Sequence, residues 1–452
     1  MVKLNKLFTP LFTGMLLGTT LLTSCTETVY REYDSQDGAM ITLTMNSGAV
    51  ITKTILEGYS NLQHATRAAL YLFEYSETGN MNDATCTYVM DFDAVGWQQN
   101  LKEASTTGSI TMQQRVSIPA SVINPNKNYV ILAIGSDESC VFDDGSKGLS
   151  GVTFKGDNST ATYGLTNGQL IKLGNKLGYC KAQLASDKKY EDIHTSELFA
   201  GTLSVSGEQL LQTAKTTQVD LYRRVAGVQG FFTNIPSSVT LNGTVYPVTS
   251  LNVVYWTEQS EAVPFMVHKD ATDPNKFVDY INTNSTPLVP ETGRTIPAAD
   301  VDKMSYITIQ QSDFAGSDDV PANAASYVLP APAAPTTANS TMYVLLLSKQ
   351  TDGSSVVVMK KKVRYVASYY TKSSTRTTVP GTDGGTGIII GQEGNQEEQA
   401  KEYNYNIVAN EFYMLGTAQQ PIDMGTGEQD VYLYVDPTWD GNHTWDKIEE
   451  IP

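Results

Sequence analysis

Short stretches of alternating apolar and polar residues recur along the whole chain. In residues 68–75, for example, Leu70 and Leu72 face opposite to Tyr71 and Phe73. Successive side chains of a strand point to opposite faces, so this period of two predicts β-strands. Further predicted strands lie at 39–45, 108–112, 115–119, 128–135, 216–228, 248–256, 341–348, 355–360, 403–410 and 430–435. Helical patterns are few, the best being 166–174 and 207–215, so the chain is predicted to be all-β.

Turn residues and apolar runs indicate how some of these strands are arranged. Asp352 and Gly353 separate the runs 341–348 and 355–360. An Asp-Gly pair between two apolar runs predicts a hairpin, because glycine tolerates positive φ. Residues 108–112 and 115–119 are expected to pair across a turn. The nearly continuous apolar run 128–135 predicts a central strand buried on both faces.

The predicted strands fall into two groups, separated by a polar stretch at 257–264. We therefore expect two β-sandwich domains in tandem, at 39–258 and 259–452. Residues 371–401 are rich in Thr, Gly and Gln and poor in core residues, which predicts an exposed loop in the second domain.

The N-terminus has the layout of a secretory signal. Lys3 and Lys6 precede an uncharged apolar segment, 7–22, that polar residues interrupt too often for a spanning helix. The sequence Leu22-Thr23-Ser24-Cys25 resembles a bacterial lipobox. That resemblance implies that 1–24 are removed, that Cys25 is acylated, and that 25–38 form a polar spacer. The alternative is an ordinary signal peptide, with Cys25 free or in a disulfide.

Composition and charge describe a folded, acidic body. The hydrophobic share is 40%, which argues against a disordered chain. The 31 basic and 48 acidic side chains give a net charge of −17. Such a protein repels phosphate backbones, so nucleic acid is not an expected partner, and attachment to a membrane would depend on the lipid.

Candidate chemistry is sparse. Cys86, Cys140 and Cys180 allow at most one internal disulfide, and their spacing does not say which pair forms it. The four histidines are far apart, and no metal site or cofactor is predicted. Motifs for a nucleophile elbow, a zinc protease, a phosphate loop or a dinucleotide are absent from the sequence, so the chain is not expected to be an enzyme.

Several short segments together resemble the Bacteroidales fimbrillins. They are the lipobox with its spacer, the predicted strands 39–45 and 70–73, the arginine-bearing segment 219–228, and the segment 406–416. The resemblance implies two transthyretin-like β-sandwich domains and a role as a subunit of type V pili. It also implies export as a surface lipoprotein of the outer membrane, with other fimbrial subunits as partners and a host or bacterial surface ligand as an adhesion target.

The family also implies a processing step. Tip and shaft subunits are cut after an arginine, losing the lipid and the first strand, whereas an anchor subunit keeps both. Here Arg31 precedes the first predicted strand, so a cut there would open no groove, and Arg67 directly abuts the strand 68–75. This favours an anchor-like subunit. The alternatives are a tip or shaft subunit and a surface lipoprotein that binds glycans. Residues 430–452 are either a strand offered to a neighbour or the last strand of the second domain.

Replacing Cys25 with alanine tests the lipid anchor. The thiol is the group that would be acylated, so the variant should be soluble or remain an uncleaved precursor. Cell fractionation followed by immunoblotting measures this. A variant that still fractionates with the outer membrane as the wild type does would contradict the prediction.

Overall fold

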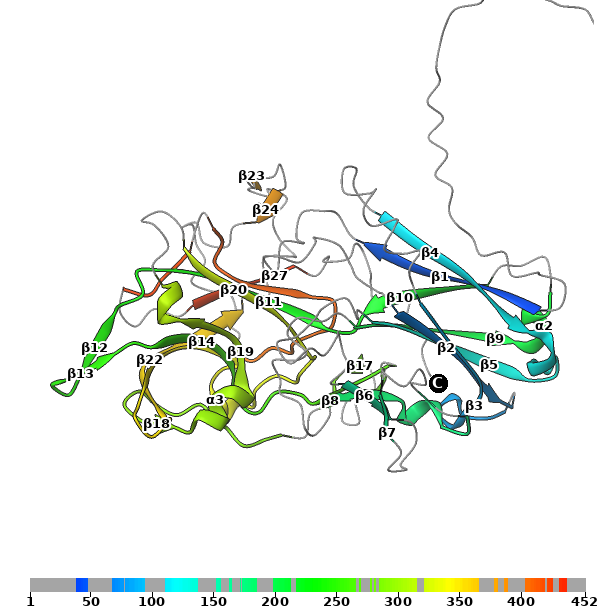
Figure 1. Cartoon of the computed structure of the whole chain (residues 1–452), viewed down its shortest axis with the longest axis horizontal. Helices are drawn as coiled ribbons and strands as arrows, with labels where there is room; N and C mark the ends of the chain where they lie inside the picture. Colours follow the sequence, from blue (N-terminus) through cyan, green and yellow to red (C-terminus); the bar gives the residue numbers. More distant parts are fainter. Residues whose placement is uncertain are drawn as a thin grey trace, which may run out of the picture. The chain divides into compact units, whose positions relative to one another are not determined.

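The chain is all-β over the residues that the structure describes. The computed structural model describes residues 38–47, 67–76, 78–93, 110–136, 152–155, 162–164, 171, 173–184, 198–212, 217–265, 268–269, 277–278, 280–281, 284–314, 321–365, 378–380, 386–388, 403–418, 421–425 and 431–436. Within them the α-helices are α2 (Gly207–Leu210) and α3 (Ala298–Met304), and single 3-10 turns supply the other helical residues. Figure 1 shows the strands and these helices.

The first large sheet has seven strands. Their order is β3 (Thr85–Asp93), β2 (Arg67–Tyr75), β5 (Asn128–Ser136), β9 (Leu198–Ser206), β10 (Thr217–Arg223), β1 (Gly38–Ser47) and β4 (Ile110–Pro119). A four-stranded sheet is formed by β15 (Ala262–Pro264), β8 (Lys181–Leu184), β6 (Val152–Lys155) and β7 (Thr162–Gly164).

The second large sheet has ten strands. Eight follow the order β19 (Ser305–Gln310), β14 (Ser250–Tyr255), β21 (Met342–Lys349), β22 (Ser355–Tyr365), β27 (Val431–Asp436), β25 (Phe412–Leu415), β11 (Ala226–Thr233) and β20 (Ala322–Val328). In addition, β18 (Thr295–Ile296) pairs with β22 and β26 (Ile422–Asp423) pairs with β11. The remaining pairs are β12 (Ser238–Leu241) with β13 (Thr244–Pro247), β16 (His268–Lys269) with β17 (Phe277–Val278), and β23 (Thr378–Pro380) with β24 (Thr386–Ile388).

The central strands of the seven-stranded sheet, β2 and β5, are buried on both faces. In β2, Leu70 and Leu72 belong to one apolar cluster and Tyr71 and Phe73 to another, and all four are fully buried. The strand β5 alternates between the same two clusters, as its continuous apolar run predicts. We call the cluster to which β1, β2, β4, β5 and β10 contribute the curl core. Its members include Ala39, Ile41, Leu43, Leu70, Leu72, Val116, Ile118, Ile131, Val219 and Leu221.

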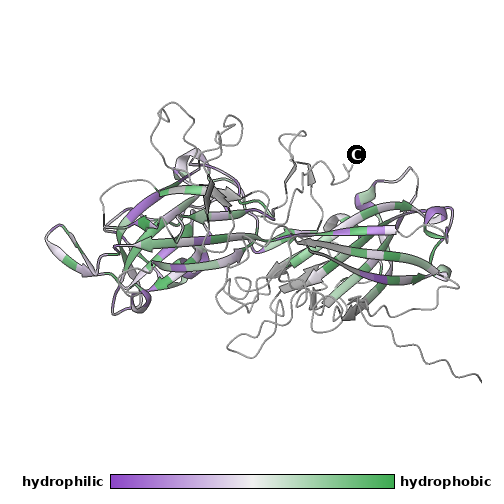
Figure 2. Ribbon diagram, turned by 90° about the horizontal axis from the view of Figure 1, so that it is seen from above, coloured by the Kyte–Doolittle hydropathy of each residue, from purple (hydrophilic) through white to green (hydrophobic). Residues whose placement is uncertain are grey.

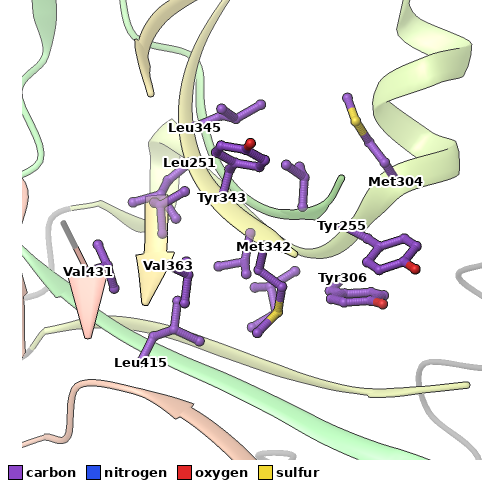
Figure 3. Close-up of a cluster of buried hydrophobic side chains, with 14 of the residues drawn as sticks. Leu251, Tyr255, Met304, Tyr306, Met342, Tyr343, Leu345, Val363, Leu415 and Val431 are labelled. Atoms are coloured by element: carbon purple, nitrogen blue, oxygen red, sulfur yellow. The ribbon is translucent and has the colours of Figure 1, made fainter. Parts of the chain in front are cut away.

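The ten-stranded sheet curls around its own core. Figure 3 shows part of this core, with Leu251, Met342, Val363 and Val431 converging from different strands. The first and last strands of the sheet meet, because the Ser326 hydroxyl of β20 donates a hydrogen bond of 2.6 Å to the Tyr306 carbonyl of β19. Apolar and polar residues follow one another along the strands in Figure 2.

The hairpin predicted at Asp352-Gly353 is confirmed. Strands β21 and β22 are antiparallel, and Gly353 has φ +87°. The Asp352 carboxylate accepts hydrogen bonds from the Ser354 amide and hydroxyl, which lower the pKa of Asp352. Helix α2 lies in the predicted segment 207–215 but is shorter, with a capping box between Ser206 and Gln209. Helix α3 was not predicted.

Two predicted strand assignments are wrong. Residues 108–112 and 115–119 do not pair across a turn, because 110–119 form the single strand β4. Gln113 and Gln114, where the turn was expected, pair with β1 as part of this strand. Residues 403–410 form no strand, apart from an isolated bridge between Ile407 and Ala331. Of the predicted loop 371–401 and the predicted helix 166–174, most residues lie outside those described.

Sheet membership also differs from the predicted domain ranges. The predicted strand 216–228 is two strands, β10 in the first large sheet and β11 in the second. Strands β11 and β14 pair with strands from the C-terminal half, although the predicted boundary at 258 assigned them to the N-terminal domain. Conversely, β15 was assigned to the C-terminal domain, but it pairs with β8 from the N-terminal half of the chain. Strand β10 alternates between buried and partly exposed residues, whereas the first five residues of β11 are all buried. The alternation in the sequence did not indicate this change of sheet.

A buried lysine makes the stability of the second sheet depend on pH. Lys361 is 5% exposed, and its Nζ lies 3.4 Å from the Asp423 carbonyl oxygen. Burial lowers the pKa of Lys361 below its usual 10.5. Between the lowered folded value and the unfolded value of about 10.5, the unfolded chain binds more protons. The free energy of unfolding should therefore rise with pH through that window.

Urea denaturation at several pH values below 10.5 tests this, with Lys361→Met as the variant. Methionine has no ammonium to desolvate, so this variant should lose the Lys361 contribution to the pH dependence. The exposed Lys349→Met, at the end of β21, is the matched control and should keep it. Equal pH profiles for wild type and Lys361→Met would contradict the assignment.

Candidate functional site

The candidate site is the first strand and its two neighbours. Strand β1 lies inside the seven-stranded sheet, parallel to β10 and antiparallel to β4 (Figure 1). It pairs with β4 over its whole length, from Gly38 opposite Pro119 to Ser47 opposite Ile110. Each side of β1 therefore makes main-chain hydrogen bonds. The chain fills this position with its own earliest predicted strand.

Side chains of β1 enter the curl core at every second residue. Ala39, Ile41 and Leu43 are 2%, 0% and 0% exposed. Complete burial of an Ile or Leu side chain stabilises a fold by about 1.5–3 kcal/mol, so these residues contribute several kcal/mol. Without β1, the walls formed by Val116, Ile118 and their neighbours would face water. The space between β10 and β4 is therefore a groove lined with apolar side chains, which an apolar strand fills.

Gly38 is the first residue of β1 and lies close to the end of β4. A Cβ at Gly38 would lie 2.6 Å from the Ile118 carbonyl oxygen and 2.7 Å from the Ser117 hydroxyl oxygen. These contacts are closer than any side chain tolerates, so glycine allows β1 to approach the end of β4. This contact was not predicted from the sequence, because it depends on which strand lies beside residue 38.

Of the candidate processing residues, Arg67 is described. It is the first residue of β2 and pairs with Asp93 of β3 on one side and with Ser136 of β5 on the other. The next residue, Ala68, is 1% exposed. A protease needs an extended, accessible backbone, so cleavage after Arg67 would require the end of β2 to separate from both neighbours.

Cys25 and Arg31 lie outside the described residues. No helix in the described part of the chain is long and apolar enough to cross a membrane.

The two described internal cysteines, Cys86 and Cys180, are not joined to each other by a disulfide. Cys86 and Cys180 are both buried in the cluster on the other face of the first sheet. Burial raises the pKa of Cys86 to about 12, which keeps its thiol protonated and unreactive. Cys140 lies outside the described residues. Among the residues placed by the structure, no three His, Cys, Asp or Glu side chains gather as a metal site.

The arginines of the segment 219–228 have structural positions that sequence reasoning missed. Arg223 is 3% exposed, and its guanidinium carbon lies 5.5 Å from the centre of the Phe199 ring. Arg224 is 4% exposed, and its Nη2 donates a 2.8 Å hydrogen bond to the Pro264 carbonyl. Two consecutive arginines between apolar residues were the available sequence signal that the chain passes from one sheet to the other here.

The C-terminal strand is also paired on both sides. Strand β27 is parallel to β22 and antiparallel to β25, with Val431 and Leu433 buried. In this structure it therefore serves as a strand of its own sheet. The rest of the predicted C-terminal donor segment, 437–452, lies outside the described residues.

Comparisons with known proteins found similarity in structure alone. No family model and no curated protein sequence matches the chain. Solved structures that resemble it include fimbrial and adhesion proteins of Parabacteroides and Porphyromonas. A fimbrial assembly protein from Parabacteroides distasonis is 9% identical, with a TM-score of 0.31, over 85% of this chain and 93% of that one. A proposed cell adhesion protein from the same organism is 10% identical, with a TM-score of 0.36, over 88% and 99%.

A third solved structure is the tip fimbrial protein Mfa3 from Porphyromonas gingivalis, with a C-terminal truncation. It is 9% identical, with a TM-score of 0.29, over 88% of this chain and 98% of that chain.

Truncating a core residue of β1 tests whether the strand is part of the stable fold. Ile41→Ala should lower the free energy of unfolding by about 2–4 kcal/mol, because the buried side chain leaves a cavity. Met40→Ala, on the opposite and half-buried face of the same strand, is the control and should cost much less. Urea denaturation of the purified chain measures both. Equal, small effects would show that β1 is not held in the curl core.

Proposed function

We propose that the chain is a structural subunit of a cell-surface fimbria, held at the outer membrane by lipid on Cys25. The observation that carries the proposal is the position of β1. It fills the groove between β10 and β4 with the chain's own residues, three of which are buried in the curl core. A subunit of this kind is complete by itself and stable before it meets a partner.

The position of Arg67 supports an anchor rather than a tip or shaft role. Release of β1 requires a cut between β1 and β2, and Arg67 is paired with β3 and β5. Arg31 lies before β1, so cleavage there would free the lipid and leave the groove filled. An uncut subunit keeps both the lipid and the first strand. Partner subunits would then bind to a protein that is fixed to the membrane by its own lipid. No catalytic role is proposed.

The mature N-terminus distinguishes the roles. Mass spectrometry of the surface protein should find an acylated Cys25 as its first residue, and depletion of the protein should release fibres into the medium. A mature chain that begins at Ala68 would instead make this a tip or shaft subunit. An intact anchor with no effect of depletion on fibres would contradict the fimbrial role itself.

A further inference from the structure

The hairpin formed by β12 and β13 is separate from the large sheets. Among the described strands, these two pair only with each other, from Ser238 opposite Pro247 to Leu241 opposite Thr244. Figure 1 shows the hairpin extending away from the ten-stranded sheet. A two-stranded hairpin alone is marginally stable in water, so this hairpin depends on the residues against which it packs.

The hairpin is held along its strands and not at its tip. Val239, Leu241 and Tyr246 are partly buried and pack against the core of the ten-stranded sheet. The two residues at the tip, Asn242 and Gly243, are both exposed. Local opening of a structure costs least where few apolar contacts are lost. The tip can therefore open while the core of the sheet stays folded.

The tip is a two-residue turn in which both residues have positive φ. Asn242 has φ 49° and Gly243 has φ 84°, as in the type I′ turn that Asn-Gly favours. A Cβ at Gly243 would meet nothing outside the adjoining residues within 4 Å. The peptide bond between the two residues therefore lies in open space. The other Asn-Gly pair of the sequence, 167–168, lies outside the described residues.

Asn242 differs from the other asparagines that have positive φ in the described part of the chain. Those three are Asn234, Asn339 and Asn410, and none of them is followed by glycine. The Asn234 side chain is also held in place, because its amide nitrogen donates a 3.0 Å hydrogen bond to the Asp423 carboxylate. Among the described residues, none forms a hydrogen bond with the Asn242 side chain. Its amide is therefore free to turn towards the following peptide nitrogen.

An exposed asparagine that precedes glycine can form a cyclic imide. The main-chain nitrogen of Gly243 gives its proton to hydroxide and attacks the side-chain carbonyl carbon of Asn242. A new C–N bond forms, the bond to the side-chain nitrogen breaks, and that nitrogen takes a proton from water and leaves as ammonia. Water then opens the imide at either of its carbonyls, which gives aspartate or isoaspartate. Glycine favours the attack because it has no side chain beside the nitrogen.

We propose that Asn242 is a site of spontaneous deamidation, and that its isoaspartyl product opens the β12–β13 hairpin while the ten-stranded sheet stays folded. Isoaspartate adds a methylene group to the main chain, so a two-residue turn no longer places Leu241 opposite Thr244. Aspartate keeps the normal main chain, and Asp-Gly forms the same type of turn. The two products therefore differ in their effect on the hairpin. The proposal does not depend on the fimbrial role.

Incubation of the purified chain in mildly alkaline buffer, followed by peptide mass spectrometry, tests the site. Residue 242 should gain the mass difference between an amide and a carboxylic acid, and fragment ions should show both aspartate and isoaspartate there. Asn234, Asn339 and Asn410 are the internal comparison and should keep their amides over the same time. An unmodified Asn242 would overturn the proposal, and so would faster reaction at any of the other three.

Hydrogen–deuterium exchange of the same samples tests the effect on the hairpin. The isoaspartyl form should lose protection in residues 238–247 and keep it in β14 and β21. Asn242→Gly is the matched control, because Gly-Gly supports the same turn and has no amide to lose, so incubation should leave its protection unchanged. Freshly prepared Asn242→Asp carries the added charge without the methylene group and should stay protected. Unchanged protection of 238–247 in the isoaspartyl form would overturn the proposal, and so would loss of protection throughout the sheet.

Discussion

The first sheet depends on main-chain pairing along both sides of β1. Strand β10 binds it in parallel and β4 binds it antiparallel, so its backbone groups are shared between two ladders. Removing β1 would separate β4 from the rest of the sheet. It would also leave empty the space in the curl core that the side chains of Ile41 and Leu43 occupy. An unpaired buried backbone group costs about as much as a lost hydrogen bond, which adds to the exposed apolar area. The position of one N-terminal strand thus determines whether the first sheet is complete.

This dependence connects the fold with processing. A cleavage site is useful for release of a strand only where the intervening backbone is accessible. Arg67 is instead the first residue of β2, with paired residues on both sides and the buried Ala68 after it. The residues that would have to separate for cleavage are the same ones that begin the burial of β2. A protease would therefore act against the stability of the sheet itself.

Local alternation predicted which residues are buried, and it predicted little about their partners. In 68–75 and 128–135 both faces were predicted correctly, because each side chain's face follows from the period alone. In 216–228 the alternation spans two sheets, and the change at Arg224 depends on a hydrogen bond to Pro264, forty residues away. The candidate site shows the same division. The strand 39–45 was predicted, but the place of β4 beside it was not, since β4 was expected as two strands of a hairpin.

The position of β1 in the first sheet makes strict demands on the strand that fills it. A strand between β10 and β4 must satisfy a parallel and an antiparallel ladder at once, and its inward residues enter a fully buried core, with room only for glycine beside Ile118. The position between β10 and β4 therefore favours one sequence, held there by the chain's own connectivity.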